Sequence, residues 1–263
     1  MEIIQSRHNP LFKQLHKLST QRRERLKTHQ TLLDGPHLLA SALDAGWRPE
    51  RLLVTPQGLV SPEIAMLVQR AGLPPTPIDP TLFAELSELP SPTGILALTT
   101  WPAAAAPRRD GLCLLLDGVQ DPGNVGTILR TAAAAGVQQV LLSPGCADVW
   151  SPKVLRAGMG AHFLLDLIER ADLPAFADAF HGVVAATLLD GAVDLHQATL
   201  TGDLALALGA EGQGISPELA ARARLRLRIP MAPGVESLNV GAAAAICLYE
   251  RVRQHGGVFP ARG

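Results

Sequence analysis

The sequence predicts an α/β protein of two domains, and three observations lead to that prediction. Strand-like and helix-like patterns alternate along the 263 residues, which is typical of α/β folds. The continuous apolar run at residues 112–116 is typical of a parallel strand that helices cover on both faces. Residues 101–109 are rich in proline and alanine and lack periodicity, as in an interdomain linker. We therefore expect domains at 1–100 and 110–263.

The first domain is expected to be a small α/β domain without a catalytic pattern. Leu11, Leu15 and Leu18 recur at helical spacing and predict an amphipathic helix followed by a basic turn. Further helices are expected at residues 37–45, 63–71 and 82–88, and strands at 31–33, 52–54 and 94–98.

Residues 7–27 are strongly basic and contain a single acid, Glu24. A solvated surface helix is the simplest explanation of a charge run, but the rest of the chain is balanced, with a net charge of −1. The one-sided charge therefore indicates contact with phosphates. The candidate residues for this contact are Arg7, Lys13, Lys17, Arg22, Arg23, Arg25 and Lys27.

The second domain is expected to be an open parallel sheet with helices on both faces. Its strands are predicted at residues 112–116, 137–142, 183–187, 204–208 and 225–229, with a possible strand at 162–165. Helices are predicted at 125–135 and 152–158 and around 241–249, and a turn at Asp190-Gly191.

Polar and glycine-rich loops follow three of these strands, at residues 117–124, 209–214 and 230–239. In open α/β sheets, ligands bind beside the carboxyl ends of the strands, where backbone groups are free. The three loops are therefore predicted to form one site.

Several other classes of site are excluded. No GxGxxG follows a strand, and no GxxxxGK or GxSxG occurs. Three widely spaced cysteines, without a CxxC pair, favour a reduced cytoplasmic protein without a structural metal. The polar N-terminus is unlike a secretory signal, and no apolar stretch reaches the ~20 residues that cross a bilayer.

The three loops together resemble those of the SpoU/TrmH family of RNA ribose 2′-O-methyltransferases, in the SPOUT superfamily. An Asn-x-Gly motif with an arginine six residues after the Asn matches Asn124, Gly126 and Arg130. Gly-x-Glu-Gly-x-Gly matches residues 209–214, and Ile-Pro-Met followed by Ser-Leu-Asn-Val matches residues 229–240. Residues 1–100 resemble, less specifically, the ribosomal-protein-like RNA-binding domain of family members that modify ribosomal RNA.

The resemblance implies a deep trefoil knot, S-adenosylmethionine as methyl donor, and a homodimer through the catalytic domain. By position it implies cofactor contacts at Thr187, Gly209, Ile229, Met231 and Leu238. It implies catalytic roles for Asn124, Arg130, Glu211, Ser237 and Asn239. An arginine stays protonated, so Arg130 is expected to hold a phosphate and stabilise the developing alkoxide.

Two residues depart from the family's pattern, and the substrate stays open. Pro233 and Gly241 stand where many members have Gly and Ser, and Pro233 removes an N–H from the loop. The favoured function is 2′-O-methylation of ribosomal RNA. The alternatives are methylation of transfer RNA, RNA binding without catalysis, and an unrelated enzyme acting on a small nucleotide.

Overall fold

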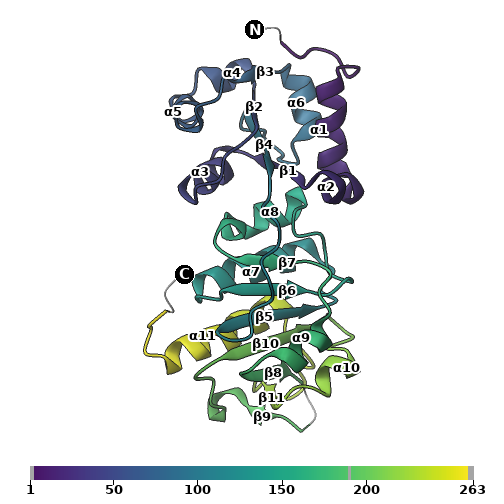
Figure 1. Cartoon of the computed structure of the whole chain (residues 1–263), viewed down its shortest axis with the longest axis vertical. Coiled ribbons are helices and arrows are strands. Elements are labelled where there is room, and N and C mark those ends of the chain that lie inside the picture. The colour runs from purple at the N-terminus through teal and green to yellow at the C-terminus, as the bar shows by residue number, and fades with distance from the viewer. Residues whose placement is uncertain (1–2, 189–190, 260–263) are drawn as a thin grey trace. The chain divides into compact units, whose positions relative to one another are not determined.

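The computed structural model describes residues 3–188 and 191–259, and the chain forms two compact units (Figure 1). Met1–Ala103 and Trp150–Phe163 make up unit 1, and Ala104–Val149 and Leu164–Gly263 make up unit 2. The turn predicted at Asp190 falls outside the described residues. No described helix has both the length and the apolar character needed to cross a membrane.

Unit 1 is built around a four-stranded sheet in the order β1-β4-β2-β3. Strand β4 is antiparallel to β1 and β2, and β3 is parallel to β2. The strands are β1 (Gln30–Asp34), β2 (Arg51–Val54), β3 (Thr76–Pro77) and β4 (Ile95–Thr100). The helices are α1 (Pro10–Thr20), α2 (Arg22–Thr28), α3 (Pro36–Asp44), α4 (Pro56–Leu59), α5 (Pro62–Ala71), α6 (Pro80–Leu86), α8 (Pro152–Gly158) and the 3-10 helix η1 (Ala161–Phe163).

Proline and a short polar residue set the starts of many of these helices. A proline at the first helical position loses no hydrogen bond that the helix needs, and the preceding side chain caps the next free N–H groups. Asn9 caps α1 and Asp79 caps α6 in this way. The predicted basic turn after the first helix is instead a second helix, α2, because only Gln21 leaves the helical conformation.

An aromatic cluster places residues 150–163 in unit 1. Trp101 and Trp150 stack with ring centroids 4.7 Å apart, and Phe163 meets Trp47 edge-on at 5.0 Å. The Thr31 hydroxyl donates to the Trp150 carbonyl at 2.8 Å. The strand predicted at 162–165 is wrong: Phe163 ends η1 and packs in this cluster, and the next strand begins only at Asp166.

Unit 2 contains a seven-stranded sheet in the order β7-β6-β5-β10-β8-β11-β9. Each of the neighbouring pairs is parallel, so the predicted open parallel sheet is confirmed. The strands are β5 (Leu112–Asp117), β6 (Gln139–Leu142), β7 (Asp166–Ile168), β8 (Val183–Thr187), β9 (Val193–Asp194), β10 (Leu204–Gly209) and β11 (Leu225–Arg228). The helices are α7 (Pro122–Ala134), α9 (Leu173–Ala179), α10 (Pro217–Ala220), α11 (Val240–Gln254) and the 3-10 helix η2 (Leu195–Gln197).

Helices cover both faces of this sheet (Figure 1). Phe176 of α9 and Leu219 of α10 pack on alternate residues of β5 and β10, such as Leu115 and Ala207. Helices α7 and α11 lie against each other. Because both faces are covered, every residue of β5 from Leu112 to Leu116 is buried.

The strand order changes direction between β5 and β10. From β5 the chain moves outward through β6 and β7, and it then returns to the other side of β5. Adjacent connections that leave in opposite directions open a crevice at the carboxyl ends of the strands. The loops after β5 and β10 therefore lie side by side, with the loop after β11 two strands away.

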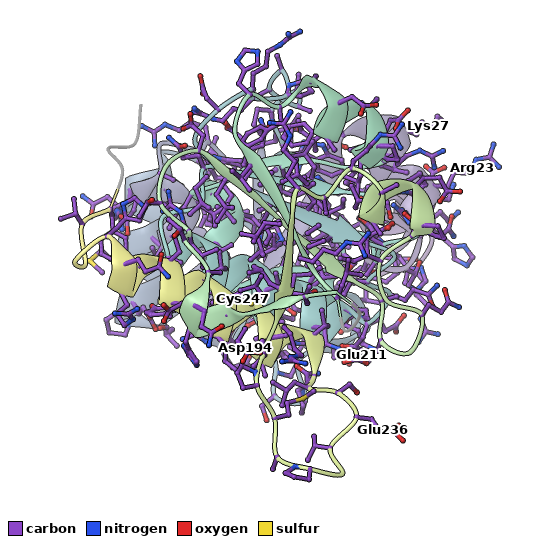
Figure 2. The ribbon with its side chains drawn as sticks, turned by 90° about the horizontal axis from the view of Figure 1, so that it is seen from below. Arg23, Lys27, Asp194, Glu211, Glu236 and Cys247 are labelled. Atoms are coloured by element: carbon purple, nitrogen blue, oxygen red, sulfur yellow. The ribbon has the colours of Figure 1, made fainter. Side chains whose placement is uncertain are left out.

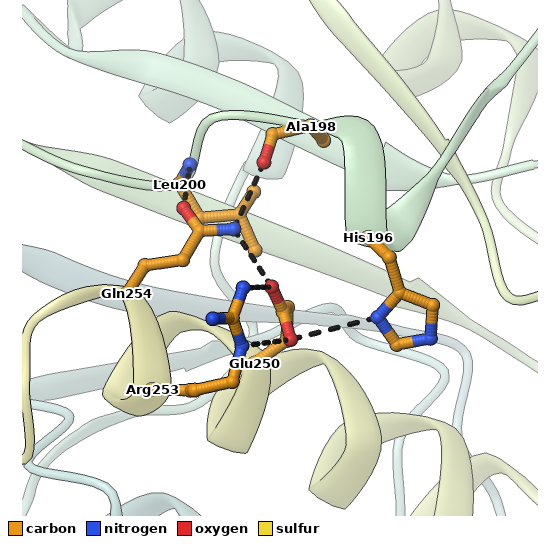
Figure 3. A network of polar contacts seen from close by, with 6 residues as sticks. All are labelled: His196, Ala198, Leu200, Glu250, Arg253 and Gln254. Carbon is orange, nitrogen blue, oxygen red and sulfur yellow. Dashed lines mark hydrogen bonds and ion pairs between the residues drawn. The ribbon is translucent and has the colours of Figure 1, made fainter.

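The carboxyl-terminal end of α11 is held by a polar network (Figure 3). Glu250 is only 7% exposed and accepts from Arg253 at 2.7 Å and from Gln254 at 2.9 Å. Gln254 also bonds the carbonyl of Ala198 and the amide of Leu200. These contacts lower the pKa of Glu250 to about 2, mainly through the hydrogen bonds from Arg253.

Candidate active site

Three side chains from the three predicted loops form a hydrogen-bonded triangle. The Asn124 amide donates to Glu211 Oε1 at 3.0 Å. The Asn239 amide donates to the same oxygen at 2.9 Å and to Asn124 Oδ1 at 2.9 Å. We call Asn124, Glu211 and Asn239 the polar triangle. Residues more than one hundred positions apart in the sequence are thus brought into direct contact.

Helix caps fix the geometry of the polar triangle. Asn239 is the N-cap of α11, and its Oδ1 accepts from the amides of Gly241 and Ala242 at 2.9 and 3.2 Å. Its Nδ2 is therefore directed at the other two members. Asn124 is not a cap. Asp121 caps α7, and its Oδ1 accepts from the backbone N–H of Asn124 at 2.7 Å. The Asn124 side chain is thus left for the triangle.

Gly241, one of the two departures from the family's pattern, lies directly against the polar triangle. A Cβ on this residue would come within 3.1 Å of Asn239 Oδ1 and 3.8 Å of Asn124 Oδ1. The first distance is tighter than an ordinary van der Waals contact. Glycine at this position therefore gives the cap room. The other departure, Pro233, is exposed in the loop before α11.

The loop after β10 is closed on itself. Ala210 and Gly214 exchange backbone hydrogen bonds of 3.1 and 2.8 Å, and a Cβ on Gly209 would lie 2.1 Å from the Gly214 carbonyl carbon. Only glycine fits at Gly209. The Ser216 amide donates to Asp117 Oδ2 at 2.9 Å, which joins the loops after β5 and β10.

Two overlapping cavities, of about 510 and 390 Å³, lie beside the polar triangle. Their combined lining includes every residue that the sequence predicts at the cofactor. Thr187 and Leu238 line both cavities, Ile229 and Met231 the larger, and Gly209 the smaller. We call the two cavities together the binding hollow.

The residues of the binding hollow fit S-adenosylmethionine. Apolar side chains such as Ile215 and Leu227 suit an adenine ring, and closely approached glycines leave backbone groups for its polar edge. Glu211 reaches the hollow from the polar triangle. Figure 2 shows Glu236 on the loop before α11, which projects from the unit, and this residue also lines both cavities.

The remaining predicted catalytic residues differ in position. Ser237 lines both cavities but is exposed and caps no helix. Arg130 is exposed on α7 and lines neither cavity. The Arg130 side chain makes no hydrogen bond or ion pair with another described residue. The structure therefore brings Asn124, Glu211, Asn239 and Ser237 together and leaves Arg130 outside the hollow.

The predicted RNA-binding residues also divide into exposed and occupied side chains. Lys13 and Lys17 are exposed on α1, and Arg23 and Lys27 point outward together from α2 (Figure 2). Arg7 is exposed and forms an ion pair with Glu85. Arg22 is half-buried.

Arg25 does not fit the RNA-binding set and is removed from it. It is 5% exposed, and its guanidinium donates to the carbonyls of Leu18 and Ser19, the latter at 3.2 Å. Those carbonyls belong to the last turn of α1, which has no helical partner for them. Arg25 therefore stabilises the corner between α1 and α2 from inside.

Sequence reasoning missed two groups of residues around the site. Asp117 and Asp121 hold the loops in place, and the aspartate-proline pair at Asp121 is a signal of a helix start. Arg226 lines the larger cavity. Its signal is the alternation of arginine and leucine from Arg224 to Arg228, which is typical of a strand with one exposed face.

The chain is similar to known protein families, to known proteins and to solved structures. Residues 111–249 match the SpoU rRNA Methylase family, and residues 9–97 match the MRM3-like substrate binding domain. The chain is 34% identical to the 23S rRNA (guanosine(2553)-2'-O)-methyltransferase RlmP of Bacillus subtilis, over 95% of this chain and 98% of that protein.

Two solved structures extend the comparison. The SpoU methyltransferase AviRb from Streptomyces viridochromogenes, in complex with AdoMet, is 28% identical, with a TM-score of 0.86 over 94% of this chain and 98% of that chain. A second structure, described as giving structural insights into the 2-OH methylation of C/U34 on tRNA, is 32% identical. Its TM-score is 0.51 over 57% of this chain and all of that chain. The resemblance found in the sequence is confirmed, and with it the expectation of an S-adenosylmethionine-dependent methyltransferase: the chain belongs to the SpoU rRNA Methylase family.

Proposed function

We propose that the protein transfers a methyl group from S-adenosylmethionine to a ribose 2′-hydroxyl of ribosomal RNA. The observation that carries this proposal is the polar triangle, which joins Asn124, Glu211 and Asn239 at one end of a hollow that fits the cofactor. A reaction that depends on alignment needs such a fixed set of donors and acceptors. Alignment alone can supply ~7–11 kcal/mol in favourable cases.

Each part of the site has a role in this proposal. The cofactor, when bound, supplies a methyl group on a sulfonium, which is reactive without further activation. Thr187, Gly209, Ile229, Met231 and Leu238 hold it, largely through backbone atoms. The polar triangle and Ser237 orient the ribose beside it.

Arg130 is proposed to hold the phosphate next to the target ribose and to stabilise the negative charge that develops on its oxygen. A guanidinium suits this role because it stays protonated and binds phosphate with two parallel hydrogen bonds. Its exposure, and the lack of a partner among the described residues, leave it open to RNA.

Ribosomal RNA is favoured over transfer RNA because of unit 1. The match to a substrate-binding domain covers residues 9–97, whereas the similarity to the protein acting on tRNA covers 57% of this chain. The exposed basic side chains at Lys13, Lys17, Arg23 and Lys27 are proposed to bind RNA phosphates, and Arg7 and Arg22 to lie at the edge of that surface.

A homodimer through the catalytic domain is also part of the proposal. Ile246 and Tyr249 are 38% and 50% exposed on α11, one turn apart on one side of the helix. An apolar stripe of this kind suits a self-complementary contact with a second copy. The trefoil knot of the family remains an expectation for the loops around β11.

The proposed location is the cytoplasm, where thiols stay reduced. All three cysteines are buried and free of disulfide bonds. Burial raises the pKa of Cys113 and of Cys247 to about 12. These thiols are therefore protonated and unreactive at neutral pH, which agrees with a core role.

Methyl transfer into purified RNA tests the function. Labelled S-adenosylmethionine, the full chain, and ribosomal or transfer RNA from a strain that lacks the protein would be incubated together. We expect label in ribosomal RNA only. Label in transfer RNA alone would favour the tRNA alternative, and RNA binding without cofactor binding in calorimetry would favour a non-catalytic role.

A paired substitution tests the RNA surface. Arg23→Ala with Lys27→Ala removes two exposed charges and should weaken RNA affinity. The slope of log affinity against log salt concentration should become shallower by up to about 2. Arg48→Ala with Arg51→Ala removes two exposed charges elsewhere in unit 1 and serves as the control. Equal effects of the two pairs would place the RNA on another surface.

A further inference from the structure

Arginine and leucine alternate along β11 and sort to different environments. Leu227 is fully buried, whereas Arg224, Arg226 and Arg228 are exposed. This is the period-2 pattern of a strand with one face in the core. The three arginine side chains therefore lie outside the core.

Two arginines close to Arg226 in the sequence have acidic partners, and Arg226 has none among the described residues. Arg222 donates to Asp178 at 2.9 Å, and Arg228 contacts Asp194 at 2.7 and 3.0 Å. A guanidinium is always charged and carries five N–H donors. Arg226 thus presents a permanent charge that no described carboxylate pairs with.

This charge lines the binding hollow. Arg226 belongs to the larger cavity together with Ile229 and Met231, while Glu211 belongs to the smaller one. Thr187 and Leu238 are common to both. The hollow therefore extends from the polar triangle to the Arg226 guanidinium.

We propose that Arg226 binds the α-carboxylate of S-adenosylmethionine, an inference that rests on the proposed placement of the cofactor in this hollow. At neutral pH the cofactor carries a positive sulfonium, a positive ammonium and one anionic group, its carboxylate. A guanidinium repels the first two and forms two parallel hydrogen bonds with a carboxylate. Arg226 is in this way a positioning residue that selects the intact amino-acid end of the cofactor.

An RNA phosphate is the competing ligand for an exposed arginine. The position of Arg226 favours the carboxylate, because it shares its cavity with the residues assigned to the cofactor. Arg224 offers the matched comparison: it precedes the same strand, is exposed, and lines neither cavity.

The test compares two ligands by calorimetry on the full-length protein. S-adenosylmethionine is measured beside its decarboxylated form, which keeps the adenosine, the sulfonium and the amine. We expect the wild type to bind the decarboxylated ligand about 10–100-fold more weakly. Arg226→Ala should weaken the binding of S-adenosylmethionine by a similar factor and leave the affinity for the decarboxylated ligand unchanged. Arg226→Lys should restore part of the loss.

Control measurements separate this inference from the proposed function. Arg224→Ala should leave both affinities unchanged, and equal melting temperatures would show that the variants are folded. If Arg226→Ala weakens the binding of both ligands equally, or of neither ligand, the inference is overturned while the cofactor site stands. Weakened RNA binding with unchanged cofactor affinities also overturns it, in favour of a phosphate contact. A wild type that binds neither ligand overturns the cofactor site and the inference together.

Discussion

The two ends of α11 are each held by one carboxylate, but the two carboxylates differ in what they leave unused. At the N-terminal end, Glu211 Oε1 accepts from Asn124 and Asn239, and Oε2 makes no hydrogen bond to a described residue. At the other end, both oxygens of Glu250 accept from Arg253 (Figure 3). Glu211 is exposed, and Glu250 is buried.

The difference separates the proposed binding arrangement around Glu211 from the structural one around Glu250. A carboxylate whose two oxygens are occupied has little left to offer a ligand. Glu250 instead orients Gln254, which bonds Ala198 and Leu200 in the segment after η2. A carboxylate that is oriented through one oxygen can accept from a ribose through the other. The same helix is thus anchored at one end and kept receptive at the other.

The largest effect is expected from Arg130, whose charge lies outside the binding hollow. Arg130→Ala should lower the rate of methyl transfer by at least about 10²–10³-fold, because it removes the group proposed to stabilise the developing negative charge. Its affinity for S-adenosylmethionine should not change, since Arg130 lines neither cavity. Rate measurements and calorimetry on the same preparation check both parts, and full activity of the variant would contradict the role.

A second substitution separates the cap from the polar triangle. Asn239→Ser keeps an oxygen that can cap α11 but removes the amide that bonds Asn124 and Glu211. We expect about 10²-fold slower transfer with a change in unfolding free energy below about 0.5 kcal/mol. Urea denaturation and single-turnover rates measure the two quantities. Equal activity would mean that the triangle is structural only.

Substitution at the carboxyl-terminal end of α11 should have the opposite effect, with lower stability and an unchanged transfer rate. Glu250→Gln removes charge-assisted hydrogen bonds with Arg253 and is expected to lower the unfolding free energy by about 1–3 kcal/mol. The transfer rate at temperatures well below melting should stay at the wild-type value. A loss of rate without a loss of stability would remove the distinction between the two ends.

The contribution of Glu250 also depends on pH. Its folded pKa, about 2, lies below the ordinary value of 4.5, so the unfolded chain takes up a proton first as pH falls. The stabilisation is complete above about pH 4.5 and disappears as the pH falls toward 2. The stability gap between wild type and Glu250→Gln should shrink over that interval in denaturation curves. A constant gap would show that the charge of Glu250 is not responsible.

The sequence was informative about the fold wherever a segment's pattern agreed with its tertiary surroundings. The apolar run that became β5 and the proline-opened helices could be predicted because their signals are local. Residues 162–165 could not, because Phe163 lies in η1 and packs against Trp47 of the aromatic cluster, whereas Leu164 is exposed. Arg25 was misassigned for a similar reason: a long basic side chain can cap carbonyls from inside.

The sequence could name the three side chains of the polar triangle but not their geometry. The motifs named Asn124, Glu211 and Asn239 and placed them at strand ends, which the parallel sheet brings together. The spacing could not show that Asn239 both caps α11 and links the other two, or that Arg130 lies outside the hollow. Those facts depend on helix phase and on side-chain direction.

The measurement that tests the account most directly is the position of the transferred methyl group, compared between wild type and Asn239→Ser. Ribosomal RNA labelled in vitro would be digested to nucleosides and separated. We expect label on a ribose 2′-oxygen with the wild type, and about a hundredth of that labelling rate with the variant. Label on a base, or equal labelling by both proteins, would contradict the proposed role of the polar triangle in ribose methylation.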